Sequence, residues 1–351
     1  MPLVGFGLWK VPAESAADTV YNVRATNQLF WRDSPLTLDL AGNQSRLPPV
    51  RWSLRLRQVH FSYHNQSSIV CTNNFSSEKE AGEGIRRAIA DGIVKRSEIF
   101  ITTKLWNNYH ARDHAISMAH AQNAAWGCDY IDLYLIHFPI ALEYVDPKQI
   151  TYPGWWTDAA KTTISRANVP VHETWSALEA LVDDGTARSI GISNAQAQTL
   201  YDISTYAKHP CSSLQIEHHP YLAQPELISL AADLKIVVTA YSSFGPQSFL
   251  ELPEAFRARA KDIPLLFDAE PVTKAAARTG KTPAQVLLRW ATQRDIAVIP
   301  KSNNVGRLAQ NLDVVGWDLT QEEIKAISAL DRGLRFNDPG FYLAKPLRIF
   351  A

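Results

Sequence analysis

The chain has 351 residues, 46% of them hydrophobic, so it can bury a large core, and its length suits two average domains or one α/β barrel of about 250 residues. Its 35 basic and 35 acidic side chains balance, which gives no reason to expect a nucleic acid or a membrane surface as partner. Three cysteines without metal-like spacing (Cys71, Cys128 and Cys211) indicate a reducing compartment, and we expect a cytoplasmic protein without a metal.

The N-terminal stretch MPLVGFGLWKVP is apolar but does not resemble a signal peptide, because it lacks a basic region and is interrupted by Gly, Lys and Pro. No apolar run in the chain reaches the roughly 18 residues that a membrane helix needs. Residues 3–9, LVGFGLW, predict a first strand.

Residues 23–77 follow no helical or strand periodicity and contain neither Glu nor Lys, although both flanks contain them. Within them lies RLPPVRWSLRLRQ (46–58), whose arginines, taken alone, suggest a nucleic-acid arm or a targeting signal. A structureless stretch of this length is unusual inside a compact domain. We therefore expect an irregular segment here.

From residue 78 onward, short apolar runs alternate with amphipathic helical stretches, which predicts parallel β/α units. The predicted strands lie at 99–106, 130–139, 188–194, 213–220, 236–243 and 296–303. The clearest helices lie at 172–185, 225–234 and 282–295. With residues 3–9, the strand count is one short of the eight in a (β/α)₈ barrel.

Each predicted strand after residue 78 ends in polar residues, where the strands of such a barrel meet around one mouth. A polar residue at a strand end can also be merely the start of a loop, but its recurrence at every end indicates a shared site. These residues are Lys104, His137, Ser193, Asn194, Glu217, His218, His219, Tyr241, Ser242, Ser243, Lys301, Ser302 and Asn303.

His137 and Lys104, on neighbouring strands, have the chemistry to polarise a carbonyl and to tune a proton donor by charge. Two alternatives stay open from the residues alone. His137 can be a structural core histidine, and Lys104 can be the Schiff-base lysine of a lyase.

The stretch IPKSNNVGRLAQN (299–311) predicts an anion site, since it places Lys301 and Arg307 at a strand–helix junction. Tyr241 can stack on a flat ring, and three residues (Ser193, Asn194 and Gln215) can hydrogen-bond a carboxamide. Together they describe NADPH bound in an extended form. The chain contains no GxGxxG, which excludes a Rossmann site.

The motifs GFGLWKV, ITTKLWN, DYIDLYLIHFP, IGISN, LQIEHHPYL, AYSSFGPQSF and IPKSN resemble those of the aldo-keto reductases, closest to the fungal D-xylose reductases. The likeness covers residues 1–22 and 78–351. It implies a single-domain (β/α)₈ TIM barrel over 1–351 that reduces an aldehyde or aldose, of the D-xylose to xylitol type. The implied cofactor is NADPH, with NADH as an alternative, and the implied role is in carbohydrate metabolism.

The resemblance also implies roles for individual residues. His137 matches the substrate-orienting histidine and Lys104 the lysine that lowers the acid's pKa. The implied cofactor contacts are Ser193, Asn194, Gln215, Tyr241, Ser242, Phe244, Gln247, Ser248, Glu251, Lys301, Ser302, Asn303, Arg307, Gln310 and Asn311. The implied substrate pocket comprises Trp9, Trp106, His137, Phe138 and Asn337. Gln310 stands where relatives that also use NADH often carry Glu. The only implied partner is a small-molecule aldehyde or aldose, and a homodimer stays open.

The family's general-acid tyrosine and the aspartate beside its lysine belong to a second-strand motif, which should fall between Asn22 and Glu78 and is absent. Tyr63 is the candidate substitute acid, but nothing around it matches the motif. We therefore expect a barrel whose second strand is disrupted by the insertion at 23–77. A cofactor-binding but catalytically impaired barrel is the alternative function.

Synonymous codons exist with which the missing motif, read out of frame, encodes Leu47–Ser53 (LPPVRWS) and Leu56–Gln58 (LRQ), and the unique codon of Trp52 requires a glycine codon in the motif's frame. Val23 and Val59 have codons that start as an intron does, and the two candidate introns together span a multiple of three bases. Residues 23–77 are thus interpreted as two retained introns around an out-of-frame exon.

Overall fold

The computed structural model describes residues 1–8, 11–32, 67–70, 75–150 and 153–350. Its eight strands form one sheet in chain order, with every neighbouring pair parallel. The strands are β1 (Gly5–Gly7), β2 (Ser67–Val70), β3 (Ile99–Leu105), β4 (Leu133–Ile136), β5 (Ile190–Ser193), β6 (Ser213–Glu217), β7 (Val237–Tyr241) and β8 (Ala297–Val298).

The sheet closes on itself next to β1. Val4 forms a parallel bridge with Val298, whose N–H donates to the carbonyl of Leu3 at 3.0 Å. The N–H of Gly7 donates to the carbonyl of Pro300 at 3.3 Å. The expected (β/α)₈ barrel is therefore confirmed.

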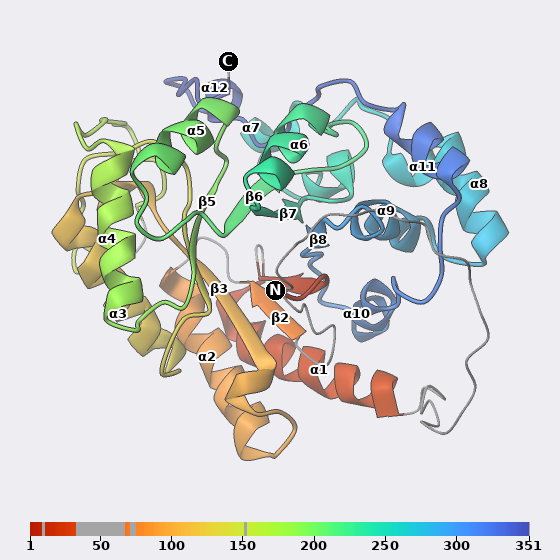
Figure 1. The fold of residues 1–351 in the computed structure, drawn as a ribbon, viewed down its shortest axis with the longest axis horizontal. Coiled ribbons are helices and arrows are strands. Elements are labelled where there is room, and N and C mark those ends of the chain that lie inside the picture. The colour runs from red at the N-terminus through yellow and green to blue at the C-terminus, as the bar shows by residue number, and fades with distance from the viewer. Residues whose placement is uncertain (9–10, 33–66, 71–74, 151–152, 351) are drawn as a thin grey trace.

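Helices surround the strands on all sides in Figure 1. They are α1 (Ala13–Arg32), α2 (Phe75–Ala90), α3 (Arg112–Trp126), α4 (Val171–Asp183), α5 (Ala197–Tyr206), α6 (Pro225–Asp233), α7 (Glu254–Arg257), α8 (Glu270–Thr279), α9 (Pro283–Thr292), α10 (Val305–Leu312), α11 (Gln321–Ser328) and α12 (Pro339–Tyr342). Single 3₁₀ turns lie at η1 (Arg96–Glu98), η2 (Asn107–Tyr109), η3 (Gly245–Ser248) and η4 (Leu266–Asp268).

The strands are apolar on both faces because one face fills the barrel and the other packs on helices. Every residue of β4, β5 and β6 is buried, which explains why these runs show no alternation of polar and apolar residues. The observed strands are shorter than predicted. Some of the polar residues at the predicted ends, such as His137, Asn194 and Ser242, lie beyond the strands in the loops of the mouth, whereas Lys104, Ser193 and Tyr241 stay in the ladder.

Helix α9 begins where its sequence predicts. Thr282 caps it by accepting the N–H of Gln285 at 3.2 Å, and the Gln285 side chain accepts the N–H of Thr282 at 3.0 Å. Pro283 occupies the first helical position, where a missing N–H costs nothing. The apolar face that follows, including Leu287 and Trp290, is fully buried.

The expectation that the barrel lacks its second strand is wrong. Ser67–Val70 forms β2, pairing with β1 in the register Phe6 to Ile69 and with β3 in the register Ile69 to Ile101. An open seam would leave backbone groups of β1 and β3 unpaired, and any segment able to extend between them removes that cost. Helix α1 also continues to Arg32, so residues 23–77 are not irregular at their ends. Tyr63 and the rest of 33–66 lie outside the described residues.

Candidate functional site

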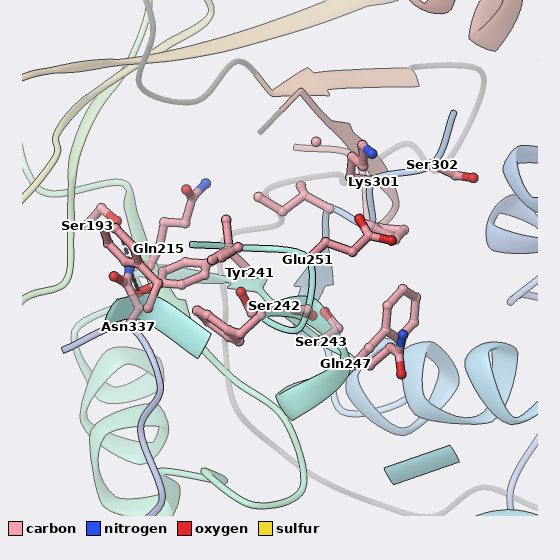
Figure 2. Close-up of a pocket in the computed structure, with 18 of the residues that line it drawn as sticks. Ser193, Gln215, Tyr241, Ser242, Ser243, Gln247, Glu251, Lys301, Ser302 and Asn337 are labelled. Carbon is pink, nitrogen blue, oxygen red and sulfur yellow. Dashed lines mark hydrogen bonds between the residues drawn. The ribbon is translucent and has the colours of Figure 1, made fainter. Parts of the chain in front are cut away.

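A cavity of about 800 Å³ opens at the carboxyl ends of the strands. Every residue that the resemblance assigns to the site lines it except Trp9, which lies outside the described residues. Of the polar strand-end residues expected at a shared site, Glu217, His218 and His219 are fully buried and do not line it. Figure 2 shows Ser193, Tyr241 and Asn337 at one end of the cavity and Lys301 and Ser302 at the other. The predicted residues that line it are Lys104, Trp106, His137, Phe138, Ser193, Asn194, Gln215, Tyr241, Ser242, Phe244, Gln247, Ser248, Glu251, Lys301, Ser302, Asn303, Arg307, Gln310, Asn311 and Asn337.

Lys104 and His137 come from adjacent strands. Lys104 pairs with Leu135 in the β3–β4 ladder, and the N–H of His137 donates to the carbonyl of Leu105 at 3.0 Å. Both side chains are buried, with Lys104 4% and His137 6% exposed. The ladder therefore brings the ammonium and the imidazole to one side of the mouth.

Burial, reinforced by the charges of Lys104 and His110, holds the pKa of His137 well below its usual range. The imidazole is therefore neutral at pH 7 and acts as a hydrogen-bonding group rather than a cation. Trp106 contacts its ring edge-on at 4.8 Å between centroids, and Phe138 stacks on it at 5.3 Å. These aromatic contacts fix the plane of the ring.

The end of the cavity near β5 and β7 is tied together by hydrogen bonds. Ser193 Oγ donates to the carbonyl of Gln215 at 2.8 Å. Asn194 Nδ2 donates to the carbonyl of His137 at 2.9 Å, and Tyr241 Oη donates to Asn194 Oδ1 at 2.6 Å. This network holds the ring of Tyr241 beside the side-chain amides of Asn194 and Gln215. The arrangement suits a ligand with a flat ring that carries a carboxamide.

The opposite end of the cavity is cationic. Arg307 Nε donates to Ser302 Oγ at 3.4 Å, and Lys301 lies on the loop before helix α10. Asn304 caps that helix by accepting the N–H of Arg307 at 3.0 Å. Two positive side chains at the N-terminal end of a helix make this end suited to a phosphate.

Between the two ends, the loop after β7 lines the cavity with hydroxyl groups. Ser242 has a φ of 53°, in the left-handed region that non-glycine residues rarely adopt. Within the described part of the chain, Ser242 Oγ and Ser243 Oγ are buried and have no hydrogen-bond partner. Donors held without a partner beside a cavity fit the pyrophosphate of a dinucleotide.

The sequence reasoning missed an aromatic wall formed by Trp155, Trp156 and Tyr342. Trp155 packs edge-on against Phe138 at 4.9 Å, and Trp106 Nε1 donates to the carbonyl of Gly154 at 2.5 Å. The only local signal was the dipeptide Trp155–Trp156 in a loop, which periodicity does not assign to any site.

Among the described residues, no group of three or more His, Cys, Asp or Glu side chains is placed to hold a metal ion. Within the same residues, no helix is both long and apolar enough to cross a membrane. The described lining of the cavity contains Glu251 as its carboxylate and no aspartate.

The family model described as Aldo/keto reductase family matches residues 61–332. The chain is 49% identical over 348 residues to the NAD(P)H-dependent D-xylose reductase of Aspergillus niger, covering 99% of this chain and 96% of that protein. It is 47% identical over 356 residues to the NAD(P)H-dependent pentose reductase of Pyricularia oryzae, covering 100% and 96%. The crystal structure of a Bombyx mori aldo-keto reductase in complex with NADP matches with a TM-score of 0.75 and 28% identity, over 99% of this chain and 94% of that chain.

Proposed function

The chain belongs to the aldo/keto reductase family, and on that premise we propose that it reduces the aldehyde of an open-chain aldopentose, such as D-xylose, with NADPH. One observation carries the proposal. The same cavity is lined by the cationic end with Lys301 and Arg307, a row of buried hydroxyl groups, the amide-bearing end and the Lys104–His137 pair. That sequence of groups matches an extended dinucleotide followed by a small carbonyl substrate.

In this proposal Lys301, Ser302, Asn303 and Arg307 hold the phosphate of the adenosine ribose, and Gln310 and Asn311 lie on the adenosine side. The pyrophosphate and adenosine lie along the loop after β7, against Ser242, Phe244, Gln247, Ser248 and Glu251. Tyr241 is the stacking ring, and Ser193, Asn194 and Gln215 bind the carboxamide. When bound, the cofactor supplies a hydride.

The substrate end is assigned to Trp106, His137, Phe138 and Asn337. The neutral imidazole of His137 orients the carbonyl by a hydrogen bond, and the charge of Lys104 favours negative charge on the oxygen. The aldehyde oxygen gains a proton as the carbon gains the hydride. The family's tyrosine and aspartate, which manage that proton, are not matched in residues 23–77.

A second candidate function is a barrel that binds NADPH and turns over slowly, because the described lining contains no aspartate. Removing a positioned acid typically lowers the rate by about 10²–10⁴. A Schiff-base lyase on Lys104 fits less well, since a lyase has no use for the phosphate-binding end. Borohydride trapping of a carbonyl substrate on Lys104 would favour it.

We further propose that the gene encodes a shorter protein in which residues 23–77 are replaced by the second-strand motif. The out-of-frame match at Leu47–Ser53 supports this, and residues 23–60 lie outside the family match, which includes residues 61–77. Sequencing the spliced transcript across codons 20–80 tests it, and a transcript that still encodes residues 23–77 as printed rules it out.

Both functions are tested with two proteins, the chain as printed and the spliced form. We expect both to bind NADPH, measured by quenching of tryptophan fluorescence, and the spliced form to oxidise NADPH in the presence of D-xylose. The printed chain should turn over about 10²–10⁴ times more slowly. Failure of both proteins to bind NADPH would contradict the proposed function, and equal turnover would contradict the loss of the acid.

A further inference from the structure

The end of β6 and the C-terminal segment are joined at one buried carboxylate. Glu217 is 0% exposed, and its two oxygens accept consecutive backbone amides from more than a hundred residues away. The N–H of Phe336 donates to Oε1 at 2.9 Å and the N–H of Asn337 donates to Oε2 at 2.8 Å. A carboxylate that holds two adjacent amides fixes both the position and the direction of that backbone.

A second buried side chain, that of His219, holds the carboxylate of Glu217 in place. His219 Nε2 lies 2.9 Å from Glu217 Oε1, and both side chains are fully buried. Burial by itself raises the pKa of Glu217, but the hydrogen bond from His219 and the charges of His219 and Arg335 hold it below its usual range. Glu217 is therefore an ionised, rigidly placed acceptor.

The segment that Glu217 holds leads directly into the cavity. Asn337 Nδ2 donates to Tyr241 Oη at 2.9 Å, and Asn337 Oδ1 accepts from Tyr342 Oη at 3.2 Å. Figure 2 shows Asn337 beside Tyr241. Tyr241 in turn donates to Asn194, whose side chain donates to the carbonyl of His137. An unbroken series of hydrogen bonds thus connects Glu217 with the backbone of His137.

Other contacts hold the same segment against the loop after β6. The amides of Arg332 and Leu334 both donate to the carbonyl of Tyr221, at 3.2 Å and 2.8 Å. Arg335 Nη2 donates to Gln224 Oε1 at 2.9 Å. These contacts precede Asn337 in the chain, so Glu217 is the contact nearest to the residue that reaches the cavity.

We propose that Glu217 is a positioning residue that sets the substrate end of the cavity by holding Asn337 against Tyr241. This inference rests on the proposed function for its substrate, an open-chain aldose. Glu217 contacts neither sugar nor cofactor in this proposal, because it lies outside the lining of the cavity. It acts on sugar affinity through Asn337, while the distant phosphate-binding end stays unaffected.

The test uses the full chain with Glu217→Gln, which keeps the shape but leaves one oxygen for two amides. Hydrogen exchange at the amides of Phe336 and Asn337 should become about tenfold faster or more, because a charged acceptor is lost. D-xylose should bind about tenfold more weakly to the chain saturated with NADP⁺, while the affinity for NADP⁺ changes less than threefold.

Asp132→Asn is the matched control. Asp132 is also buried, accepts the N–H of Ile101 at 2.9 Å and pairs with Arg96 at 2.8 Å, but it lies immediately before β4, at the end of the strand away from the mouth. It should lower thermal stability without changing exchange at Phe336 and Asn337 or sugar affinity. If Glu217→Gln does not fold, Glu217→Asp keeps the charge, moves the oxygens back and should shift both readouts in the same direction.

A double-mutant cycle with Asn337→Ala identifies the path. If Glu217 acts through Asn337, the sugar affinity of the double variant should equal that of Asn337→Ala alone. Fully additive effects, or unchanged exchange in Glu217→Gln, would overturn the proposal. Faster exchange in Glu217→Gln, with no D-xylose binding by the parent chain or any variant, would instead overturn the proposed substrate. It would still support the conclusion that Glu217 holds the backbone of Phe336 and Asn337.

Discussion

The hydroxyl group of Tyr241 takes part in two hydrogen bonds, one as acceptor and one as donor. It accepts from Asn337 and donates to Asn194, which leaves the face of the ring as the surface presented to a ligand. Burial raises the pKa of this phenol well above its usual range, with Glu217 adding to the effect, so the hydroxyl stays protonated. In the proposed function, Tyr241 is therefore a residue whose ring stacks on the cofactor and does not donate a proton to substrate.

Arg307 is the residue on which the preference for NADPH should depend most. Arg307→Ala removes a charge-assisted hydrogen bond to the ribose phosphate, so NADPH should bind about 10 to 100 times more weakly while NADH changes little. Fluorescence titration with both nucleotides measures this. Arg278→Ala, which removes an arginine paired with Glu323 away from the cavity, is the control. An equal loss for both nucleotides would contradict the assignment.

Gln310 offers the converse test. Gln310→Glu places a carboxylate near the proposed ribose, where it accepts hydrogen bonds from free hydroxyl groups and repels a phosphate. The ratio of NADH to NADPH affinity should rise by about tenfold. A ratio that stays constant would mean that Gln310 lies away from the ribose.

At the scale of elements, we expect helix α10 to link the stability of the chain to cofactor binding. Its N-cap, Asn304, accepts the N–H of Arg307, so the cap holds the backbone of a proposed phosphate ligand. Helix α11 has a comparable cap, in which Thr320 accepts the N–H of Glu323 at 3.2 Å. Removal of either cap should destabilise its helix, but only the α10 cap holds a residue of the proposed cofactor site. Comparison of the two therefore separates an effect on stability from an effect on binding.

Asn304→Ala should lower the free energy of unfolding by about 1 kcal/mol and weaken NADPH binding several-fold. Thr320→Ala should cost a similar free energy without changing NADPH affinity. Urea unfolding and fluorescence titration give the two quantities. Equal NADPH affinities in the two variants would show that the α10 cap has no role in binding.

A buried polar cluster joins α2, α3 and the back of β3. Glu78 Oε1 accepts from Thr103 Oγ1 and, at 3.0 Å, from Gln122 Nε2, which also donates to the carbonyl of Lys104 at 3.2 Å. Burial raises the pKa of Glu78 to about 7, against the hydrogen bonds from Thr103 and Gln122. Between pH 4.5 and 7 the folded chain therefore keeps a proton that the unfolded chain has lost.

The free energy of unfolding should thus fall by about 3 kcal/mol through this group as pH rises from 4.5 to 7. Glu78→Gln removes this dependence. The free energy of unfolding of the variant minus that of the parent chain should therefore be larger at pH 8 than at pH 4.5. Urea unfolding at both pH values measures it, with the exposed Glu226→Gln as control. A constant difference at the two pH values would contradict the raised pKa.

At the scale of the whole molecule, several histidines are buried in neutral form. Burial lowers the pKa of His110 to about 3, and the pKa values of His137 and His218 also lie well below the usual range because of burial. Below pH 6.5 the unfolded chain binds protons at these positions and the folded chain does not. Their contribution to stability is present above pH 6.5 and is lost as pH falls toward the folded-state values.

His110→Leu should reduce the slope of unfolding free energy against pH by about 1.4 kcal/mol per pH unit between pH 5.5 and 4. Denaturant unfolding across that range measures the slope. The exposed His120→Leu should leave the slope much closer to that of the parent chain. Identical slopes in His110→Leu and the parent chain would contradict a neutral buried His110.

Most of the site was predictable because a parallel barrel brings its strand ends together. The direction of the strands alone predicts that residues at the ends of the apolar runs lie close together, whatever the loops do. These residues include Lys104, His137, Tyr241 and Lys301. Contacts made by irregular segments were not predictable. Trp155 reaches the cavity from a long loop, and Glu217 meets Phe336 across a separation that no periodicity encodes.

The sequence by itself determined the class of fold, the order of its units from residue 78 onward and the residues around the mouth, because each of these follows from local pattern and strand direction. Only the tertiary structure decided that Ser67–Val70 fills the gap between β1 and β3, and that Glu217 holds the backbone of Asn337. In both cases buried backbone N–H or C=O groups must find a hydrogen-bond partner. Because these groups are nearly the same in every residue, the sequence does not show which partner they find.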